Sequence, residues 1–235
     1  MLWKTIRRFG VSKSILIVES KGDKLFLEAL IGFIRLENIE FSNPICKIDD
    51  YLCLGGKDNL RKELRELKTE VAKGEVARIG VILDADNAGI PARIKTINEI
   101  LTALQFPIQL TKLNEWSNYE DEASGNTISI SCHVLNFGGH GELETVLRAI
   151  KSEKSVFADC LESWKNCLHA NDETITQKEF DKFWVNIYQR YDCCSKDEKT
   201  QAGKYCSDEA SMKKPIWNFK HEALTELKAY LSIFT

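Results

Sequence analysis

The sequence predicts an α/β fold in which a mainly parallel sheet is flanked by helices and followed by a helical C-terminal region. Through the first half of this 235-residue chain, short apolar runs alternate with segments of helical periodicity, as in repeated strand–helix–strand units. Beyond about residue 150 only the helical periodicity continues. We therefore expect an α/β domain over residues 1–150 and a helical region over residues 151–235, either packed on that domain or appended to it.

Local patterns predict the elements of the first half. Residues 15–18 and 79–83 are continuous apolar runs, typical of strands that are buried on both faces. Residues 57–73 carry one narrow apolar stripe among charged residues, which predicts a helix that covers the sheet with one face and ends at Gly74. We also expect helices over 23–34, 90–104 and from about 142, a weaker strand over 45–54, an exposed loop over 114–126 and an alternating strand over 128–135.

The last third predicts helices over 156–169, 176–192 and 219–233, with a polar connection over 195–215. This region is rich in aromatic residues. Their simplest interpretation is a hydrophobic core, and stacking on nucleobases is the alternative.

Composition limits the possible partners. The net charge of −3 gives no global basic field, so binding of nucleic acid requires a local basic patch. The basic residues of the helix over 57–73 indicate a solvated face, with such a patch as the alternative; they are Lys57, Arg61, Lys62 and Arg65. No apolar run approaches the roughly 20 residues of a membrane span, and the first basic residues precede no apolar signal core. We expect a cytoplasmic protein with no membrane contact.

The eight cysteines show no paired C-x2-C spacing. We expect free, mostly buried thiols, with Cys160 and Cys167 on one face of a helix as small core residues. The alternative is a soft-metal site that gathers Cys193, Cys194 and Cys206 with His169.

Pairs of acidic residues follow three predicted strands, where each strand turns into a helix. They are Glu19 and Asp23, Asp84 and Asp86, and Glu142 and Glu144. The carboxyl ends of parallel strands share one edge of a sheet, so these acids are expected to converge there. Crowded carboxylates raise one another's pKa unless a cation neutralises them, and Mg²⁺ or Mn²⁺ prefers such oxygen ligands. The sequence therefore favours a metal-dependent phosphoryl site.

The spacing within each pair adds detail. Glu19 and Asp23 are four residues apart and point to one side if the helix starts at once. Glu142 and Glu144 are two apart and cannot both face the site on a regular helix, so we favour Glu144. Acids in a first helical turn also act as caps, which is the alternative for Asp23, Glu142 and Glu144. Lys21 is a candidate contact for a phosphate charge. His140 lies among glycines and is interpreted as a solvated loop histidine. The alternative is that His140 acts as a general base or contacts a phosphate.

These motifs resemble the Toprim domain, the catalytic domain shared by type IA and type II topoisomerases, bacterial primases and nucleases of the overcoming-lysogenization-defect type. The resemblance lies in residues 17–23 (IVESKGD), residues 81–89 (VILDADNAG) and the later GELE of residues 141–144. It covers roughly residues 13–150 and is greatest with small stand-alone prokaryotic Toprim-like proteins. Two departures are Ser20, where Toprim domains commonly have glycine, and Asp23, where the nuclease branch often has glutamate.

The resemblance implies a Rossmann-like sheet and a set of roles. Asp84 and Asp86 are implied to hold a divalent metal, and Glu19 to bind metal or act as general acid or base. Asp23 and Glu144 are implied to complete a second metal position.

Three classes of function follow. The first is Mg²⁺- or Mn²⁺-dependent cleavage of nucleic-acid phosphodiesters, with Glu19 and Lys21 as catalytic candidates. The second is a Toprim-fold module that binds a nucleotide or metal without turnover. The third is an interaction subunit of a larger nucleic-acid-processing or defence system, for example beside an ATPase, because the chain has no P-loop of its own.

Overall fold

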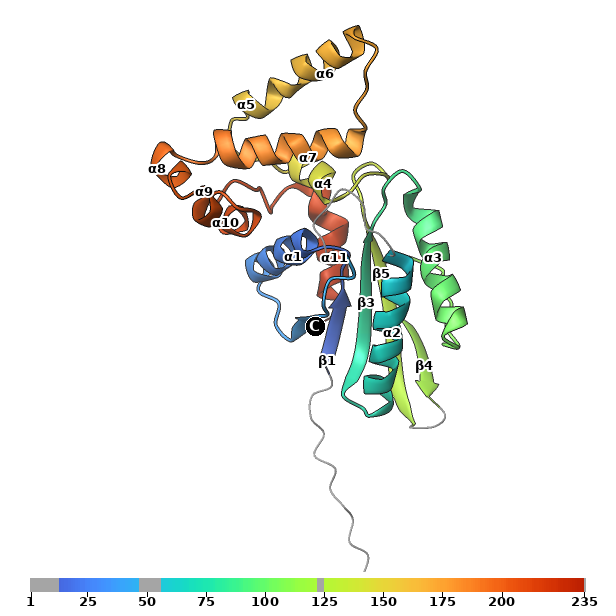
Figure 1. Cartoon of the computed structure of the whole chain (residues 1–235). Helices are drawn as coiled ribbons and strands as arrows, with labels where there is room; N and C mark the ends of the chain where they lie inside the picture. The colour runs from blue at the N-terminus through green and yellow to red at the C-terminus, as the bar shows by residue number, and fades with distance from the viewer. Residues whose placement is uncertain (1–12, 47–55, 122–124, 235) are drawn as a thin grey trace, which may run out of the picture.

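The computed structural model describes residues 13–46, 56–121 and 125–234 (Figure 1). These residues form a five-stranded sheet in the order β2-β1-β3-β5-β4, in which only the pairing of β4 with β5 is antiparallel. The strands are β1 (Lys13–Ile17), β2 (Ile39–Phe41), β3 (Val76–Asp84), β4 (Ser117–Asp121) and β5 (Asn126–Leu135). The α/β fold with a mainly parallel, Rossmann-like sheet is confirmed.

The two edges of the sheet differ from the prediction. The segment 114–126, expected as a loop, contains the short polar strand β4, which has no apolar pattern of its own and pairs with the regular strand β5. On the other edge, β2 pairs with β1, with Ile15 opposite Glu40. The weak strand expected over 45–54 falls largely outside the described residues, and Ile45 and Cys46 are not in a strand. Their backbone amides nevertheless bond to the carbonyls of Val18 and Glu19, at 3.1 and 2.7 Å.

Alternate side chains of the central strands enter two separate cores. Ile15 and Ile17 of β1 face the layer formed by α2 (Gly56–Ala72) and α3 (Gly89–Ala103). Leu16 and Val18 face the opposite layer, which contains α1 (Lys21–Ile34), α4 (Leu143–Ala149) and the helical C-terminal region. Figure 1 shows α2 and α3 on one side of the sheet and α1 and α11 on the other. Burial of each such side chain contributes about 1.5–3 kcal/mol.

The helical C-terminal region completes the second core. Its elements are α5 (Val156–Asp159), α6 (Leu161–Ala170), α7 (Gln177–Ile187), the π-helix η1 (Tyr188–Asp192), α8 (Lys196–Lys199), α9 (Ala202–Tyr205), α10 (Asp208–Met212), η2 (Glu222–Leu224) and α11 (Thr225–Ser232). Tyr230 and Phe234 approach β3 so closely that a Cβ on Gly80 would lie 2.5–2.6 Å from their side chains. The region is thus packed on the α/β part, and Trp184, Tyr188 and Trp217 are core residues.

The cysteines depart from the prediction. Cys194 and Cys206 form a disulfide. Both sulfurs are therefore unavailable to the soft-metal site considered with Cys193 and His169. Cys160 and Cys167 are exposed, because α6 stands away from the core and buries none of its own residues.

The connection over 195–215 holds three short helices where only a polar stretch was expected. None of the described helices combines the length and the apolar character that crossing a bilayer requires.

Candidate functional site

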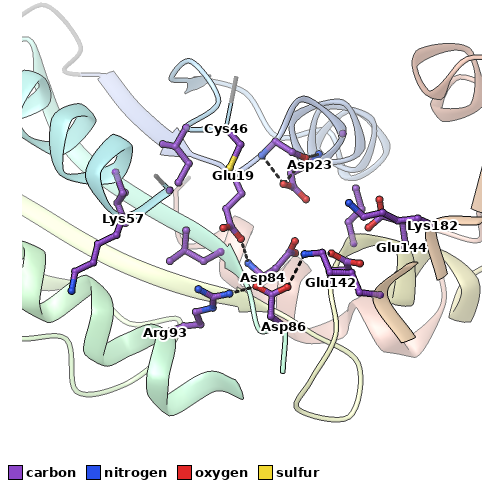
Figure 2. A pocket seen from close by; sticks show the side chains of 18 of the residues that line it. Glu19, Asp23, Cys46, Lys57, Asp84, Asp86, Arg93, Glu142, Glu144 and Lys182 are labelled. Carbon is purple, nitrogen blue, oxygen red and sulfur yellow. Dashed lines mark hydrogen bonds and ion pairs between the residues drawn. The ribbon is translucent and has the colours of Figure 1, made fainter. Parts of the chain in front are cut away.

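A cavity of about 460 Å³ lies at the carboxyl ends of β1 and β3. Figure 2 shows acidic side chains from several elements, with Arg93 pointing toward Asp86. The lining of the cavity includes all five predicted metal ligands and one acid that the prediction had set aside: Glu19, Asp23, Asp84, Asp86, Glu144 and Glu142. Strand-end acids that are distant in sequence therefore lie in one cavity.

Glu19 follows the last residue of β1 by two positions and reaches across to β3. Its Oε2 accepts a 2.6 Å hydrogen bond from the backbone amide of Asp84. Burial raises the pKa of Glu19, and the bond from the Asp84 amide opposes that rise. The carboxylate is fixed in place by the backbone of the next strand, while its pKa moves toward the range in which a group can transfer protons.

Asp23 has a capping role and a second feature that capping does not explain. Its Oδ2 accepts hydrogen bonds from the amide and the hydroxyl of Ser20, each 2.8 Å long, and the Asp23 amide donates to Ser20 Oγ. This reciprocal capping box starts α1. The other carboxylate oxygen of Asp23, Oδ1, is buried with no hydrogen-bond partner among the described residues. Burial raises the pKa of Asp23 to about 6, with the Glu19 charge contributing.

Glu142 and Glu144 both line the cavity, so the expectation that only Glu144 faces it was wrong. The reason is that Glu142 is the N-cap of α4, with extended backbone angles of −138° and −173°, and the spacing rule for a regular helix does not apply to it. Glu142 is 3% exposed, and its Oε1 is a second buried oxygen without a partner in the described chain. Burial and the charge of Glu144 raise the pKa of Glu142 to about 7.

Asp84 lies at the centre of this carboxylate cluster (Figure 2). Burial raises its pKa well above the ordinary range, and the charges of four surrounding acids raise it further; they are Asp23, Glu19, Glu144 and Glu142. Such mutual repulsion costs free energy in the native state unless protons or cations enter. A proton or a bound cation would therefore lower the free energy of the cluster.

Asp86 is held differently, because both of its oxygens pair with cations of the protein. Arg93 of α3 binds Oδ2, and Lys178 of α7 lies 3.0 Å from Oδ1. The backbone of Asp86 is left-handed, with φ of 47°, and exchanges hydrogen bonds of 2.8 and 3.2 Å with Gly141. That bridge ties the end of β3 to the loop before α4 and so brings Glu142 to the cavity.

Four basic side chains also line the cavity: Lys57, Arg93, Lys178 and Lys182. The other polar residues of the lining are Ser20, Thr96, Asn186 and Asp208. Arg93, Lys178 and Lys182 were missed in the sequence, where only the i, i+4 spacing of the last two on one predicted helix marks a common face. Lys21 is exposed at the start of α1 and does not belong to the described lining. Neither does His140, which lies beside Gly89. Of the basic helix face that begins at Lys57, only Lys57 itself lines the cavity.

The acids fit a divalent cation chemically, although they are not arranged as a ready coordination cage. In the described part of the chain, no three His, Cys, Asp or Glu side chains converge closely enough to hold a metal ion as they stand. Two observations favour a cation nonetheless: the unpartnered buried oxygens of Asp23 and Glu142, and the raised pKa of the central Asp84. Hard oxygen donors of this kind suit Mg²⁺ or Mn²⁺.

Comparison with known proteins gives a family but no function. No curated protein and no solved structure significantly matches the sequence. A family described as "Protein of unknown function (DUF3226)" matches residues 13–234, which is nearly the whole chain and includes both the sheet and the helical C-terminal region. The chain belongs to this family.

Proposed function

We propose that this chain cleaves phosphodiester bonds of nucleic acid with the help of Mg²⁺ or Mn²⁺, as a Toprim-like nuclease. The observation that carries the proposal is the convergence of six acids from three strand ends on one cavity whose wall also holds four basic side chains. Acids that hold a cation beside basic residues that neutralise phosphate oxygens form the usual polar composition of a phosphoryl-transfer site. The resemblance of residues 17–23, 81–89 and 141–144 to Toprim motifs supports the same reaction.

Roles can be proposed for the residues. Asp84, with Asp23, Glu142 and Glu144 around it, would hold the cation, which supplies Lewis-acid stabilisation of the charge that develops on the phosphate. One oxygen of Glu19 accepts the hydrogen bond from the Asp84 amide. The other oxygen would accept a proton from water. Arg93 and Lys182 would neutralise the remaining phosphate charge.

Calorimetry with Mg²⁺ and Mn²⁺ tests the metal, comparing the wild type with Asp84→Asn/Asp86→Asn. The double variant Asp58→Asn/Glu66→Gln is a matched control, because it removes the same charge from two exposed positions of α2. We expect binding in the wild type and the control, and none in the Asp84/Asp86 variant. End-labelled single- and double-stranded DNA and RNA are then incubated with each protein and Mn²⁺. Cleavage that survives Glu19→Gln would contradict the assigned role of Glu19.

A second candidate is a module that binds a nucleotide or metal without turnover. It is favoured by the two cations on Asp86, since both carboxylate oxygens are paired with side chains of the protein itself. Such a module binds Mn²⁺ and a nucleotide in calorimetry but leaves every labelled substrate intact.

A further inference from the structure

One face of α7 lines the cavity, and this helix lies outside the region of Toprim resemblance. Lys178, Lys182 and Asn186 follow one another at intervals of four residues and all line the cavity. The opposite face of α7 is buried, with Phe180 and Trp184 in the second core. The helical C-terminal region therefore supplies part of the site. Its packing sets the backbone positions from which these three side chains extend.

α7 is held firmly behind this face. Thr176 caps the helix, accepting a 3.2 Å hydrogen bond from the Glu179 amide. Asp181, 1% exposed, pairs with Arg148 and accepts a 2.8 Å hydrogen bond from the Thr145 hydroxyl of α4. The backbone of α7 is thus tied to the same short helix whose N-cap is Glu142, and a change at Lys178 leaves these anchors intact.

The ammonium of Lys178 lies between two acids of the cluster. Its Nζ is 3.0 Å from Asp86 Oδ1 and 2.8 Å from Glu142 Oε2. The other oxygen of Glu142, Oε1, is buried and has no hydrogen-bond partner among the described residues. The same is true of Oδ1 of Asp23, which lines the same cavity. Lys178 and Arg93 pair with Asp86 and Glu142, which are two of the six strand-end acids on this cavity. A divalent ion that bound Glu142 would repel the ammonium of Lys178.

The ammonium of Lys178 also has room to move away from Asp86 and Glu142. The side chain of Lys178 is 37% exposed, whereas that of Glu142 is 4% exposed. The flexible four-carbon stem allows the ammonium to turn toward the cavity mouth while the acids stay in place. Lys182 lies one turn further along the same face of α7 and lines the same cavity.

We propose that Lys178 is an exchangeable internal cation: a divalent metal ion that binds the acids displaces its ammonium from Asp86 and Glu142, and the released ammonium, with Lys182, binds a phosphate group of the substrate. This inference rests on the proposed metal-dependent function. Metal and phosphate binding are then coupled, because each favours the position of Lys178 that the other needs.

The first arm measures Mn²⁺ binding alone, by calorimetry, in the wild type, Lys178→Met, Lys178→Arg and Lys57→Met. Methionine keeps the unbranched stem without its charge, and arginine keeps a competing cation. Lys57 also lines the cavity but pairs with Glu99, at 2.5 Å, and so controls for the general loss of one positive charge. We expect Lys178→Met to bind Mn²⁺ about tenfold more tightly than the wild type, equivalent to about 1.4 kcal/mol. Lys178→Arg and Lys57→Met should stay within about threefold of the wild type.

The second arm measures binding of methyl phosphate with and without saturating Mn²⁺. In the wild type, Mn²⁺ should tighten phosphate binding about fivefold or more, within the usual range of coupling between sites. In Lys178→Met, phosphate binding in Mn²⁺ should be about tenfold weaker than in the wild type, although the metal is bound more tightly. Thermal unfolding of each variant shows that it is folded under the conditions of both arms.

The outcomes separate the two proposals. Absence of Mn²⁺ binding in all four proteins overturns the proposed metal-dependent function and this inference with it. Mn²⁺ binding in the wild type that is unchanged or weaker in Lys178→Met, or equally tightened in Lys57→Met, overturns the exchange and leaves the metal site standing. Tighter Mn²⁺ binding with unchanged phosphate affinity overturns the role of Lys178 toward phosphate.

Discussion

The backbone amide of Asp84 donates a 2.6 Å hydrogen bond to the carboxylate of Glu19, 65 residues earlier in the sequence. The bond fastens the end of β1 to the end of β3 at the point where the acids gather. It also means that Glu19 has a structural role in addition to any chemical one. The two roles are separable by substitution.

Glu19→Ala should lower the free energy of unfolding by about 1–3 kcal/mol, because it leaves the partly buried amide of Asp84 without its acceptor. Glu19→Gln keeps an oxygen acceptor and removes one charge from a crowded cluster, so it should be at least as stable as the wild type. Urea unfolding followed by tryptophan fluorescence at pH 7.5 measures both. An alanine variant as stable as the wild type would show that the bond does not hold the strand ends together.

The cluster should make the protein more stable as the pH falls from 7.5 toward 5. The pKa of Asp23 is raised by burial to about 6, so its contribution is fully present below about pH 3.8 and is lost as the pH rises through about 6. Glu142, with its pKa raised to about 7, acts in the same direction. Asp23→Asn keeps the acceptor for Ser20 and should flatten the profile by about 1.4 kcal/mol between pH 7.5 and 5.

The buried His133 opposes this trend, because burial lowers its pKa to about 4 and its contribution is lost as the pH falls below about 6.5. His133 is present in both proteins, so the difference between wild type and Asp23→Asn isolates the acid. Denaturant unfolding at a series of pH values measures it. Parallel profiles would contradict the raised pKa of Asp23.

Gly141 should tolerate no side chain. Its φ is 90°, and a Cβ there would lie 2.7 Å from the hydroxyl oxygen of Thr145. Gly141→Ala combines the cost of a left-handed backbone with a clash, so we expect a loss of about 3 kcal/mol. Gly139 has a similar φ of 92° but open space around it, and Gly139→Ala should cost only about 1–2 kcal/mol. Equal losses in chemical denaturation would mean that Thr145 gives way.

The disulfide between Cys194 and Cys206 should stabilise the short helices of the C-terminal region. The two residues are 12 apart in sequence, and closing a loop of that size contributes about 3 kcal/mol in the chain-entropy model. Cys206→Ser should lower the unfolding free energy by about 2–3 kcal/mol. Cys167→Ser, at an exposed free cysteine, is the control. Because cytoplasmic disulfides are rare, mass spectrometry of thiols trapped in cells also tests the expected location.

Much of the fold was predictable because it rests on local patterns. The apolar run over 79–83 becomes β3, and the stripe from Leu60 to Val71 becomes the buried face of α2, which ends before Gly74 with its φ of 74°. The edge strands were not predictable in the same way. β2 and β4 are stabilised by pairing with β1 and β5 rather than by a pattern of their own.

In the candidate site, too, the residues that depend on local patterns were predictable and those that depend on long-range packing were not. The acids at strand ends were found in the sequence, because the topology of parallel sheets brings such positions to one edge. Glu142 was set aside because a helix boundary was placed one residue too early, which turned a cap into a helical position. Lys178 and Lys182 were missed because their approach to the acids depends on how α7 packs on α4, a long-range contact without a local signature.

The late position of Lys178 in the chain has a consequence for synthesis. A ribosome releases all six acids before it releases α7, so for a time the growing polypeptide carries these acids and lacks the lysine that pairs with Asp86 and Glu142. In that interval the acids meet the ions of their surroundings without Lys178 as a competitor, although Arg93 is already present. A chain that took up a divalent ion then would have to fold α7 around a site that was already filled.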